Sequence, residues 1–177
     1  MGQYVSVPTM ASLDDDINSG AVTRRLRALS ADMPLCVLVV DDDELERALI
    51  ADRLAERGIN TLQAADGAEA LAMLQGTPVQ VIVVDWHMPV MDGIEFTERF
   101  RAELPGDTYV IMLTARKDDF DFERGYRAGV DDYLTKGVRE PELMARIHAG
   151  MNTFSLRTQL REARAALQLA VRGREGN

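Results

Sequence analysis

The stretch LCVLVVDDD, residues 35–43, sets the pattern on which the predicted fold rests. Its first six residues are apolar without alternation, which is typical of a strand covered on both faces, as in a parallel sheet. Its last three residues are aspartates, placed where such a strand would end. The single cysteine, Cys36, lies inside the run, and we expect it to be a buried strand residue.

Similar short runs recur along the chain and alternate with helical patterns. The predicted strands cover residues 37–40, 61–64, 79–84, 109–113 and 133–134. The predicted helices lie near residues 44–57, 68–74, 94–104 and 119–128, and a last one begins near Pro141. In the first helix we expect one face to be lined by Leu45, Leu49, Ile50 and Leu54. Strands and helices in alternation predict an α/β, doubly wound, five-stranded parallel sheet with right-handed crossovers.

The flanks of this region differ from it. We expect residues 1–33 to be a flexible or weakly helical extension, residues 34–150 one compact domain, and residues 151–177 a helical extension. In the last region apolar residues recur at steps of four and three: Leu156, Leu160, Ala163, Leu167 and Ala170. This spacing keeps them on one helix face, so the last helix should run to near residue 171, with room for a bend at Gly150.

Charge and composition exclude several classes of protein. The formal net charge of −9 argues against direct nucleic-acid binding. No apolar stretch approaches the roughly 20 residues that span a bilayer, and the N-terminus lacks the pattern of a secretory signal. A single unpaired thiol fits a reducing compartment. We therefore expect a cytoplasmic protein without membrane insertion.

Polar residues follow four of the predicted strands. Asp41 and Asp42 follow the first, Asp85 the third, Thr114 the fourth, and Lys136 the fifth. Ligands bind outside the carboxyl ends of strands in an open parallel sheet, where the strand order reverses. If the order is 2-1-3-4-5, as in flavodoxin-like folds, the first and third strands are neighbours and their aspartates converge.

Converging carboxylates repel one another, so they raise each other's pKa or recruit a cation. Hard oxygen ligands on a partly open site suit Mg²⁺, or Mn²⁺. One carboxylate can act as the nucleophile of an aspartyl phosphate, with Lys136 and Thr114 as ligands of the phosphate oxygens. Each residue alone has an ordinary explanation as a helix cap, a turn residue or a solvated lysine. Their joint placement at four strand ends favours a site.

Four segments carry a family resemblance: VVDDD (39–43), VDWHMPVMDG (84–93), MLTAR (112–116) and AGVDDYLTK (128–136). They resemble the receiver domain of two-component response regulators, and the resemblance covers about residues 35–150. It implies that the phosphoryl group comes from a phosphohistidine on a sensor histidine kinase or a phosphotransfer protein. It also implies a signalling domain rather than an enzyme, although such a domain assists its own phosphotransfer and dephosphorylation.

The resemblance assigns roles to the residues that match. Asp85 looks like the phosphoacceptor. Asp42 resembles a direct metal ligand and Asp41 a ligand acting through water. His87 would give the metal its backbone carbonyl rather than its ring, because no second histidine or cysteine is placed to help.

The remaining assignments concern the phosphate and the switch. Lys136 resembles the lysine that pairs with the phosphate, and Thr114 the switch hydroxyl. Tyr133 resembles the switch aromatic, which turns inward when Thr114 moves toward the phosphate. His87 and Arg116 flank the site, and our hypothesis is that their bulk sets the lifetime of the phosphorylated state.

One residue departs from the family pattern. Proline usually follows the lysine, often after a cis bond, whereas this chain has Gly137. A cis bond without proline costs about 2.5–4 kcal/mol. We therefore expect a trans bond or a rearranged loop, either of which affects the pose of Lys136.

The output and some competing functions stay open at this stage. No effector domain is recognisable after residue 150, so we expect output through contact with a downstream protein. The C-terminal helix could form a homodimer, bind a partner or pack back onto the domain. The chain could also be the receiver part of a truncated diguanylate-cyclase-type regulator, or a phosphorylation-independent scaffold. A haloacid-dehalogenase-like phosphatase would need an aspartate where His87 stands.

Overall fold

The structure, a computed structural model, describes residues 35–115 and 122–175. The strands are β1 (Cys36–Val40), β2 (Asn60–Ala64), β3 (Val81–Asp85), β4 (Tyr109–Thr114) and β5 (Asp132–Thr135). The helices are α3 (Glu44–Ala55), α4 (Gly67–Leu74), α5 (Gly93–Glu103), α6 (Phe122–Ala128) and α7 (Glu140–Glu175). The predicted N-terminal extension, Arg116 and the first residues of the predicted fourth helix lie outside the described residues.

The strands form one parallel sheet in the order β2-β1-β3-β4-β5, which confirms the predicted fold class. Val40 of β1 lies opposite Val84 of β3, and Asp85 lies opposite Leu113 of β4. This register brings the residues that end β1 and β3 to the same edge of the sheet. The order reverses between these two strands, which is where a ligand site is expected.

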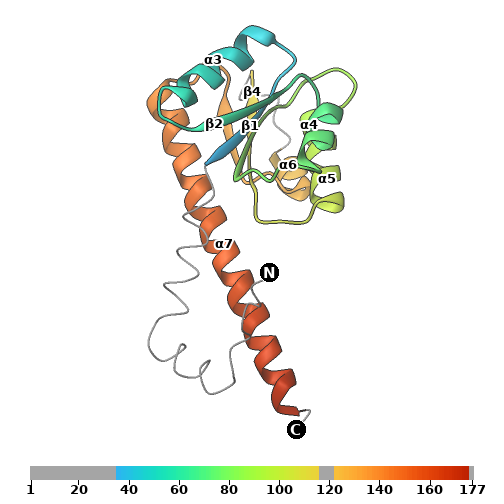
Figure 1. The fold of residues 1–177 in the computed structure, drawn as a ribbon. Coiled ribbons are helices and arrows are strands. Elements are labelled where there is room, and N and C mark those ends of the chain that lie inside the picture. Colours follow the sequence, from blue (N-terminus) through green and yellow to red (C-terminus); the bar gives the residue numbers. More distant parts are fainter. Residues whose placement is uncertain (1–34, 116–121, 176–177) are drawn as a thin grey trace, which may run out of the picture. The chain divides into compact units, whose positions relative to one another are not determined.

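Helices cover both faces of the sheet, with α4, α5 and α6 on one side and α3 and α7 on the other (Figure 1). Along β1, Leu38 and Val40 belong to the first core cluster and Val37 and Val39 to the second, all with 0% exposure. Burial on both faces explains the apolar runs without alternation. Cys36 is an exception to the prediction: it is only half-buried, because it opens the strand at the rim of the sheet.

The buried face that we predicted for the first helix, α3, is partly wrong. Ile50 and Leu54 are buried, whereas Leu45 is 81% exposed and Leu49 is 51% exposed. Leu45 and Leu54 are nine residues apart, about two and a half turns at 3.6 residues per turn, so they point to opposite sides. The helix buries only the half of the apolar set that faces the sheet.

The last helix, α7, is continuous from Glu140 to Glu175. Its first part contributes Leu143, Met144 and Ile147 to the core. At Gly150 the helix passes so close to the sheet that an added Cβ would lie 2.7 Å from the Tyr109 ring. The glycine is therefore explained by close packing of α7 on β4.

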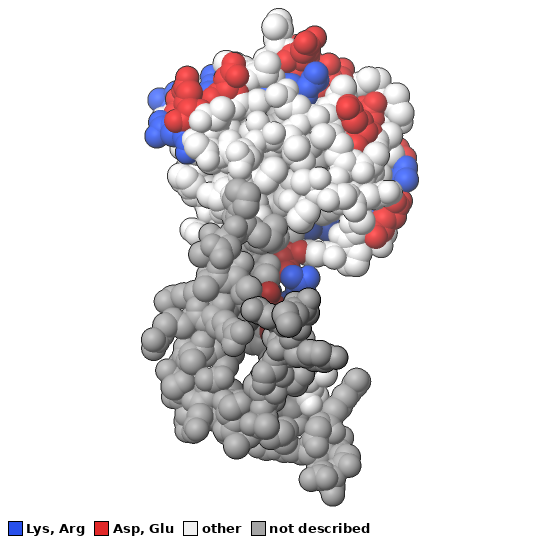
Figure 2. Space-filling model, viewed as in Figure 1, with Lys and Arg blue, Asp and Glu red and all other residues white. Residues whose placement is uncertain are grey.

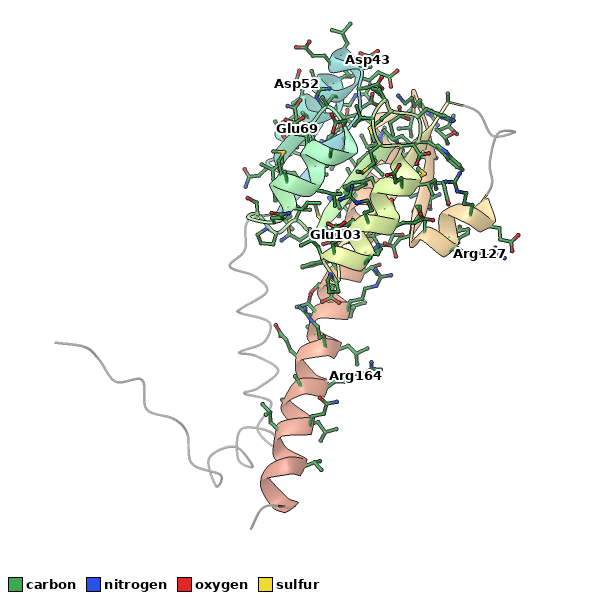
Figure 3. The ribbon with its side chains drawn as sticks, turned by 90° about the vertical axis from the view of Figure 1, so that its right-hand side faces the viewer. Asp43, Asp52, Glu69, Glu103, Arg127 and Arg164 are labelled. Atoms are coloured by element: carbon green, nitrogen blue, oxygen red, sulfur yellow. The ribbon has the colours of Figure 1, made fainter. Side chains whose placement is uncertain are left out.

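Beyond residue 150 the helix is tied to the domain by polar contacts. The Asp131 carboxylate accepts a hydrogen bond from Arg157 at 2.6 Å, and Asp107 pairs with Arg161 at 3.0 Å. The predicted seam is exposed over this segment, with Leu156 at 67%, Leu160 at 53% and Leu167 at 66%. Arg164 projects from the part of α7 that extends beyond the domain (Figure 3).

The surface agrees with the acidic composition. Acidic side chains stand out on the face shown in Figure 2, with basic ones scattered between them. Of the residues that the structure describes, no helix combines the length and apolar character needed to cross a membrane.

Candidate functional site

Three carboxylates meet at the edge of the sheet where β1 and β3 end. Ligand atoms of Asp41, Asp42 and Asp85 all lie within 4.8 Å of one another. Asp41 has 0% exposure and Asp85 has 3%, whereas Asp42 is exposed. The group therefore combines two buried oxygen donors with one that faces solvent. Such a set fits a hard divalent cation that keeps part of its water shell.

Local hydrogen bonds hold the acidic segment in place. Asp43 caps α3, because its Oδ1 accepts from the backbone N–H groups of Leu45 and Glu46 at 2.8 and 3.3 Å. Asp41 Oδ1 in turn accepts from the backbone N–H of Asp43 at 2.9 Å. Asp43 is thus the helix cap, and Asp42 lies with the other two carboxylates.

Lys136 places its positively charged ammonium group among these carboxylates. Its Nζ lies 2.9 Å from Asp85 Oδ2, 3.0 Å from Asp41 Oδ2 and 3.1 Å from Glu46 Oε2. Partial burial lowers the pKa of Lys136, but hydrogen bonds to Asp85, Asp41 and Glu46 outweigh it and leave that pKa above its ordinary value. The lysine is thus a fixed positive charge at any physiological pH.

The Asp85 carboxylate has a raised pKa. Burial is the main cause, and the neighbouring charge of Asp41 adds to it. The hydrogen bond and charge of Lys136 and the backbone of His87 act in the opposite direction. Burial destabilises the charged form of this carboxylate. A bound cation or esterification would therefore stabilise the site by neutralising that charge.

The turn after Lys136 explains how glycine replaces proline. The Val138 N–H donates to the Thr135 carbonyl at 3.1 Å, and Gly137 takes a φ of 76°. Proline cannot adopt this φ, whereas glycine adopts it without strain. Among the described residues no peptide bond is cis. The bond between Lys136 and Gly137 is trans, which confirms the first of the two alternatives that we expected.

Thr114 and Tyr133 lie on adjacent strands beside the carboxylates. Thr114 ends β4 with 2% exposure, and its carbonyl accepts from the Lys136 N–H at 2.7 Å. The Tyr133 ring lies between Trp86, at a centroid distance of 6.4 Å, and Tyr126, at 5.4 Å. The Oη of Tyr133 is buried.

His87 follows Asp85 by two residues and is exposed. Its ring stacks on Trp86 at 5.9 Å. Its predicted flanking partner, Arg116, lies outside the described residues.

Two residues at the site escaped prediction from the sequence. Glu46 was read only as part of a helix, yet it pairs with Lys136 across the sheet edge. Gly125 was read only as part of the fourth helix, yet a Cβ there would collide with Tyr133. Gly137 indicated that the pose of Lys136 could differ from the family's, but nothing in the sequence pointed to a contact from α3.

Comparison with known proteins identifies the family. The model of the response regulator receiver domain matches residues 37–148. The phosphate regulon transcriptional regulatory protein PhoB of Escherichia coli K12 is 36% identical over 120 residues, which cover 67% of this chain and 52% of that protein. The chain thus spans about half the length of the curated relatives that it matches.

Solved structures agree. The receiver domain of the Francisella response regulator 1452 is 37% identical with a TM-score of 0.62, covering 67% of this chain and 97% of that one. The receiver domain of a sensor histidine kinase from Pseudomonas aeruginosa PAO1 is 28% identical with a TM-score of 0.63, covering 68% and 99%. That structure is described with a magnesium ion coordinated in its active-site cleft.

Proposed function

Because the chain belongs to the response regulator receiver domain family, we propose that Asp85 is its phosphoacceptor and that the phosphoryl group arrives from a phosphohistidine. The donor would be a sensor histidine kinase or a phosphotransfer protein. The observation that carries the proposal is the position of Lys136, whose ammonium lies 2.9 Å from Asp85 inside the acidic group. We assign residues 34–150 to the receiver unit, residues 1–33 to an N-terminal extension and residues 151–177 to a helical one.

The carboxylate group fits a divalent cation by its donor chemistry. Asp42, Asp85 and the backbone carbonyl of His87 would hold Mg²⁺ or Mn²⁺, with Asp41 acting through water. The bound cation would neutralise charge on the phosphoryl oxygens and on the carboxylates. The two buried aspartates, at 0% and 3% exposure, are the groups that gain most from that neutralisation.

Asp85 attacks the phosphorus with one carboxylate oxygen, and the bond from phosphorus to the donor's histidine nitrogen breaks. The product is an aspartyl phosphate, and the electron pair of the broken bond stays on the imidazole. Lys136 is already within ion-pair distance of Asp85 and pairs with a phosphoryl oxygen after transfer. Thr114 donates its hydroxyl to another.

The switch uses the same residues. As Thr114 moves toward the phosphate, Tyr133 holds or takes the inward position against α6, and a surface formed by α6, β5 and α7 changes. We propose that this surface contacts a downstream protein in the cytoplasm rather than nucleic acid. His87 and Arg116 set the rate of hydrolysis, and replacing both with alanine should change it.

The proposal is tested by intact-mass measurement after incubation with a small phosphodonor and Mg²⁺. The wild-type chain should gain one phosphoryl group, and Asp85→Asn should gain none. Asp66→Asn is a matched control, because Asp66 is not one of the clustered carboxylates and caps α4, where asparagine caps equally well. Loss of labelling in the control, or equal labelling of Asp85→Asn, would refute the assignment; an unlabelled wild type would favour the phosphorylation-independent scaffold.

The exposed leucines of α7 support a second proposal, a homodimer. Leu156, Leu160 and Leu167 are each more than half exposed and share one helix face. Replacing Leu160 and Leu167 with glutamine should yield monomers at concentrations where the wild type is dimeric. Leu169→Gln is the control, since Leu169 is equally exposed at 71% but off that face. None of the relatives or structures compared above favours the diguanylate-cyclase alternative.

A further inference from the structure

Glu46, in the first turn of α3, makes the third ion pair of Lys136. Its Oε2 lies 3.1 Å from Nζ, close to the 2.9 and 3.0 Å of Asp85 and Asp41. Its side chain is 44% exposed, whereas those of Asp41 and Asp85 are 0% and 5% exposed. Glu46 is not among the carboxylates that gather within 4.8 Å. Its side chain thus pairs with the lysine without being one of the three clustered carboxylates.

At Gly137, the residue after Lys136, no neighbouring side chain among the described residues packs against the turn. A Cβ added to Gly137 would meet nothing within 4 Å. A recess of about 90 Å³ separates the turn from α3, lined in part by Glu46, Arg53 and Val138. A lysine side chain without restraint samples many rotamers, of which few place the ammonium at the phosphoacceptor.

Polar contacts from α3 span this recess. Glu46 and Arg53 are seven residues apart, a spacing that puts them on one side of the helix, and Arg57 follows two residues after the helix ends. They contact, in order, the Lys136 Nζ at 3.1 Å, the Val138 carbonyl at 3.2 Å and the Glu140 carboxylate at 2.5 Å. One side of α3 and the turn that ends it therefore contact the segment from β5 to α7 at every second residue.

We propose that Glu46 is a positioning residue for phosphoryl transfer, which holds the Lys136 ammonium beside Asp85 in a loop that has glycine where proline is usual. The role rests on the proposed function of Asp85. The contact does not involve Asp85, so it persists when that carboxylate becomes an ester. Asp41 holds the ammonium from the end of β1, and Glu46 adds a second carboxylate from α3.

A carboxylate near the site also repels an anionic phosphodonor, and this effect has the opposite sign. Removing the charge would then speed phosphorylation, and more so for a more highly charged donor. Loss of positioning would slow it for every donor. The direction of the change therefore separates the two roles.

The experiment measures initial phosphorylation rates by intact mass with acetyl phosphate and with phosphoramidate, each with Mg²⁺. Glu46→Ala should slow both reactions by about three- to tenfold, the scale set by freeing one lysine side chain. Glu46→Gln should retain most of the rate, because its amide oxygen still accepts a hydrogen bond from Nζ. Glu44→Ala, a charge loss in the same helical turn without a described contact to Lys136, should leave both rates unchanged.

A double-mutant cycle with Lys136 tests whether Glu46 changes the phosphorylation rate through its contact with the lysine. In the Lys136→Ala background, Glu46→Ala should cause no further loss. An equal loss in that background, or rates at or above wild type for Glu46→Ala, would overturn the proposal while leaving Asp85 as phosphoacceptor. Absence of phosphorylation in the wild type would overturn both. Thermal unfolding of each variant shows that the rates compare folded proteins.

Discussion

A Cβ built on Gly125 would lie 1.7 Å from the Oη of Tyr133, so the α6 glycine and the β5 tyrosine compete for one space. The hydroxyl of Tyr133 fills that space in the structure. Trp86, the only tryptophan of the chain, lies 6.4 Å from the same ring. Gly125 therefore permits the inward position of Tyr133, and Trp86 can report on it.

Gly125→Ala should destabilise the protein by about 2 kcal/mol, the range for overpacking a filled site, although alanine is otherwise the better helix former. It should also change the fluorescence of Trp86 by displacing Tyr133. Both are measured during urea unfolding. Gly76→Ala is the control, because a Cβ there meets nothing within 4 Å. In a Tyr133→Ala background the cost of Gly125→Ala should disappear; a cost that stays would mean that Tyr133 is not its cause.

Gly93→Ala should distort the backbone that carries Asp85. A Cβ at Gly93 would lie 2.3 Å from the Asp85 carbonyl oxygen and 3.2 Å from the Trp86 Cα, both backbone atoms. Backbone yields less readily than a side-chain tip, so we expect a loss of about 1–3 kcal/mol in unfolding free energy. Displacement of Asp85 should also slow its phosphorylation. Wild-type stability together with a wild-type rate would contradict this account of the close approach.

Asp85→Asn should stabilise the metal-free protein at neutral pH. The pKa of Asp85 is raised in the folded chain, chiefly by burial. Such an acid supports folding fully below its unfolded pKa, and that support is lost as the pH rises through the folded value. The advantage of asparagine should therefore grow from acidic to neutral pH. Lys136 keeps Asp41 and Glu46 as partners in the variant.

Melting temperatures of both proteins in a chelator, across this pH interval, provide the measurement. A difference that is independent of pH would show that the ionisation of Asp85 is not responsible. Added Mg²⁺ should narrow the difference, because the cation offsets the buried charge of the wild type.

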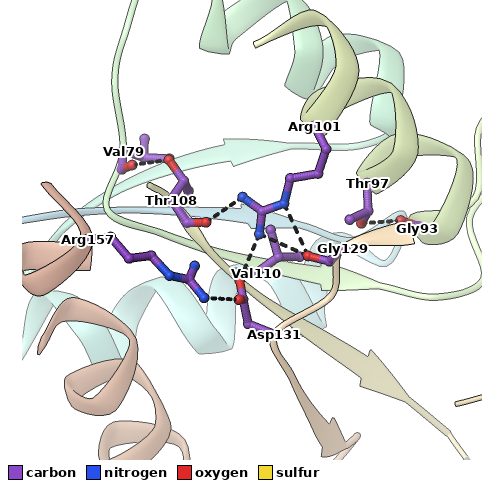
Figure 4. Close-up of polar contacts among 9 residues, drawn as sticks. All are labelled: Val79, Gly93, Thr97, Arg101, Thr108, Val110, Gly129, Asp131 and Arg157. Atoms are coloured by element: carbon purple, nitrogen blue, oxygen red, sulfur yellow. Dashed lines mark hydrogen bonds and ion pairs between the residues drawn. The ribbon is translucent and has the colours of Figure 1, made fainter. Parts of the chain in front are cut away.

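Among the residues that hold the base of α7, replacement of Asp131 should lower the unfolding free energy most. Its Oδ2 accepts from Arg101 at 2.7 Å and from the Val110 N–H at 2.8 Å, and its Oδ1 accepts from Arg157 (Figure 4). Asp131→Ala leaves the Val110 N–H without its acceptor and removes the carboxylate partner of Arg101, which keeps only the Thr108 and Gly129 carbonyls. The carboxylate is 13% exposed, so we expect a loss of about 3 kcal/mol.

Arg157→Ala removes only the outer partner of Asp131. The Arg157 side chain is 41% exposed, and an exposed pair contributes less than about 1 kcal/mol. Urea unfolding of the two single variants and the double variant separates the contributions. Equal losses for Asp131→Ala and Arg157→Ala would show that Arg101 and Val110 do not depend on the carboxylate.

The sheet and the strand-end residues were predictable because they follow local rules. Runs without alternation, such as Val37–Val40, occur where both faces are covered, and parallel strands carry their last residues to one edge. The convergence of Asp41 and Asp85 needed only the strand order. The turn at Gly137 was predictable in outline, since proline and glycine differ in the φ that each can adopt.

The contacts that could not be predicted join residues remote in sequence. Glu46 and Lys136 are 90 positions apart, and their pairing depends on how α3 lies over the sheet. The exposure of Leu45 and Leu49 likewise depends on which side of α3 meets the sheet. Apolar spacing shows that a helix has a buried side, but residues spread over more than half of its circumference leave the choice open.

The unbroken α7 has a mechanical consequence. Its 36 residues make a rod about 54 Å long at 1.5 Å per residue, held by the core and, as far as Arg161, by Asp131 and Asp107. The 14 residues beyond Arg161 extend about 21 Å, so a tilt of roughly 5° where the helix is held would move the free tip by about 2 Å, because displacement grows in proportion to the length of a stiff helix. A shift of a fraction of an ångström in the part of α7 that packs on the strands would thus become a larger displacement at the free end of the helix. The continuous helix has no hinge that would absorb it.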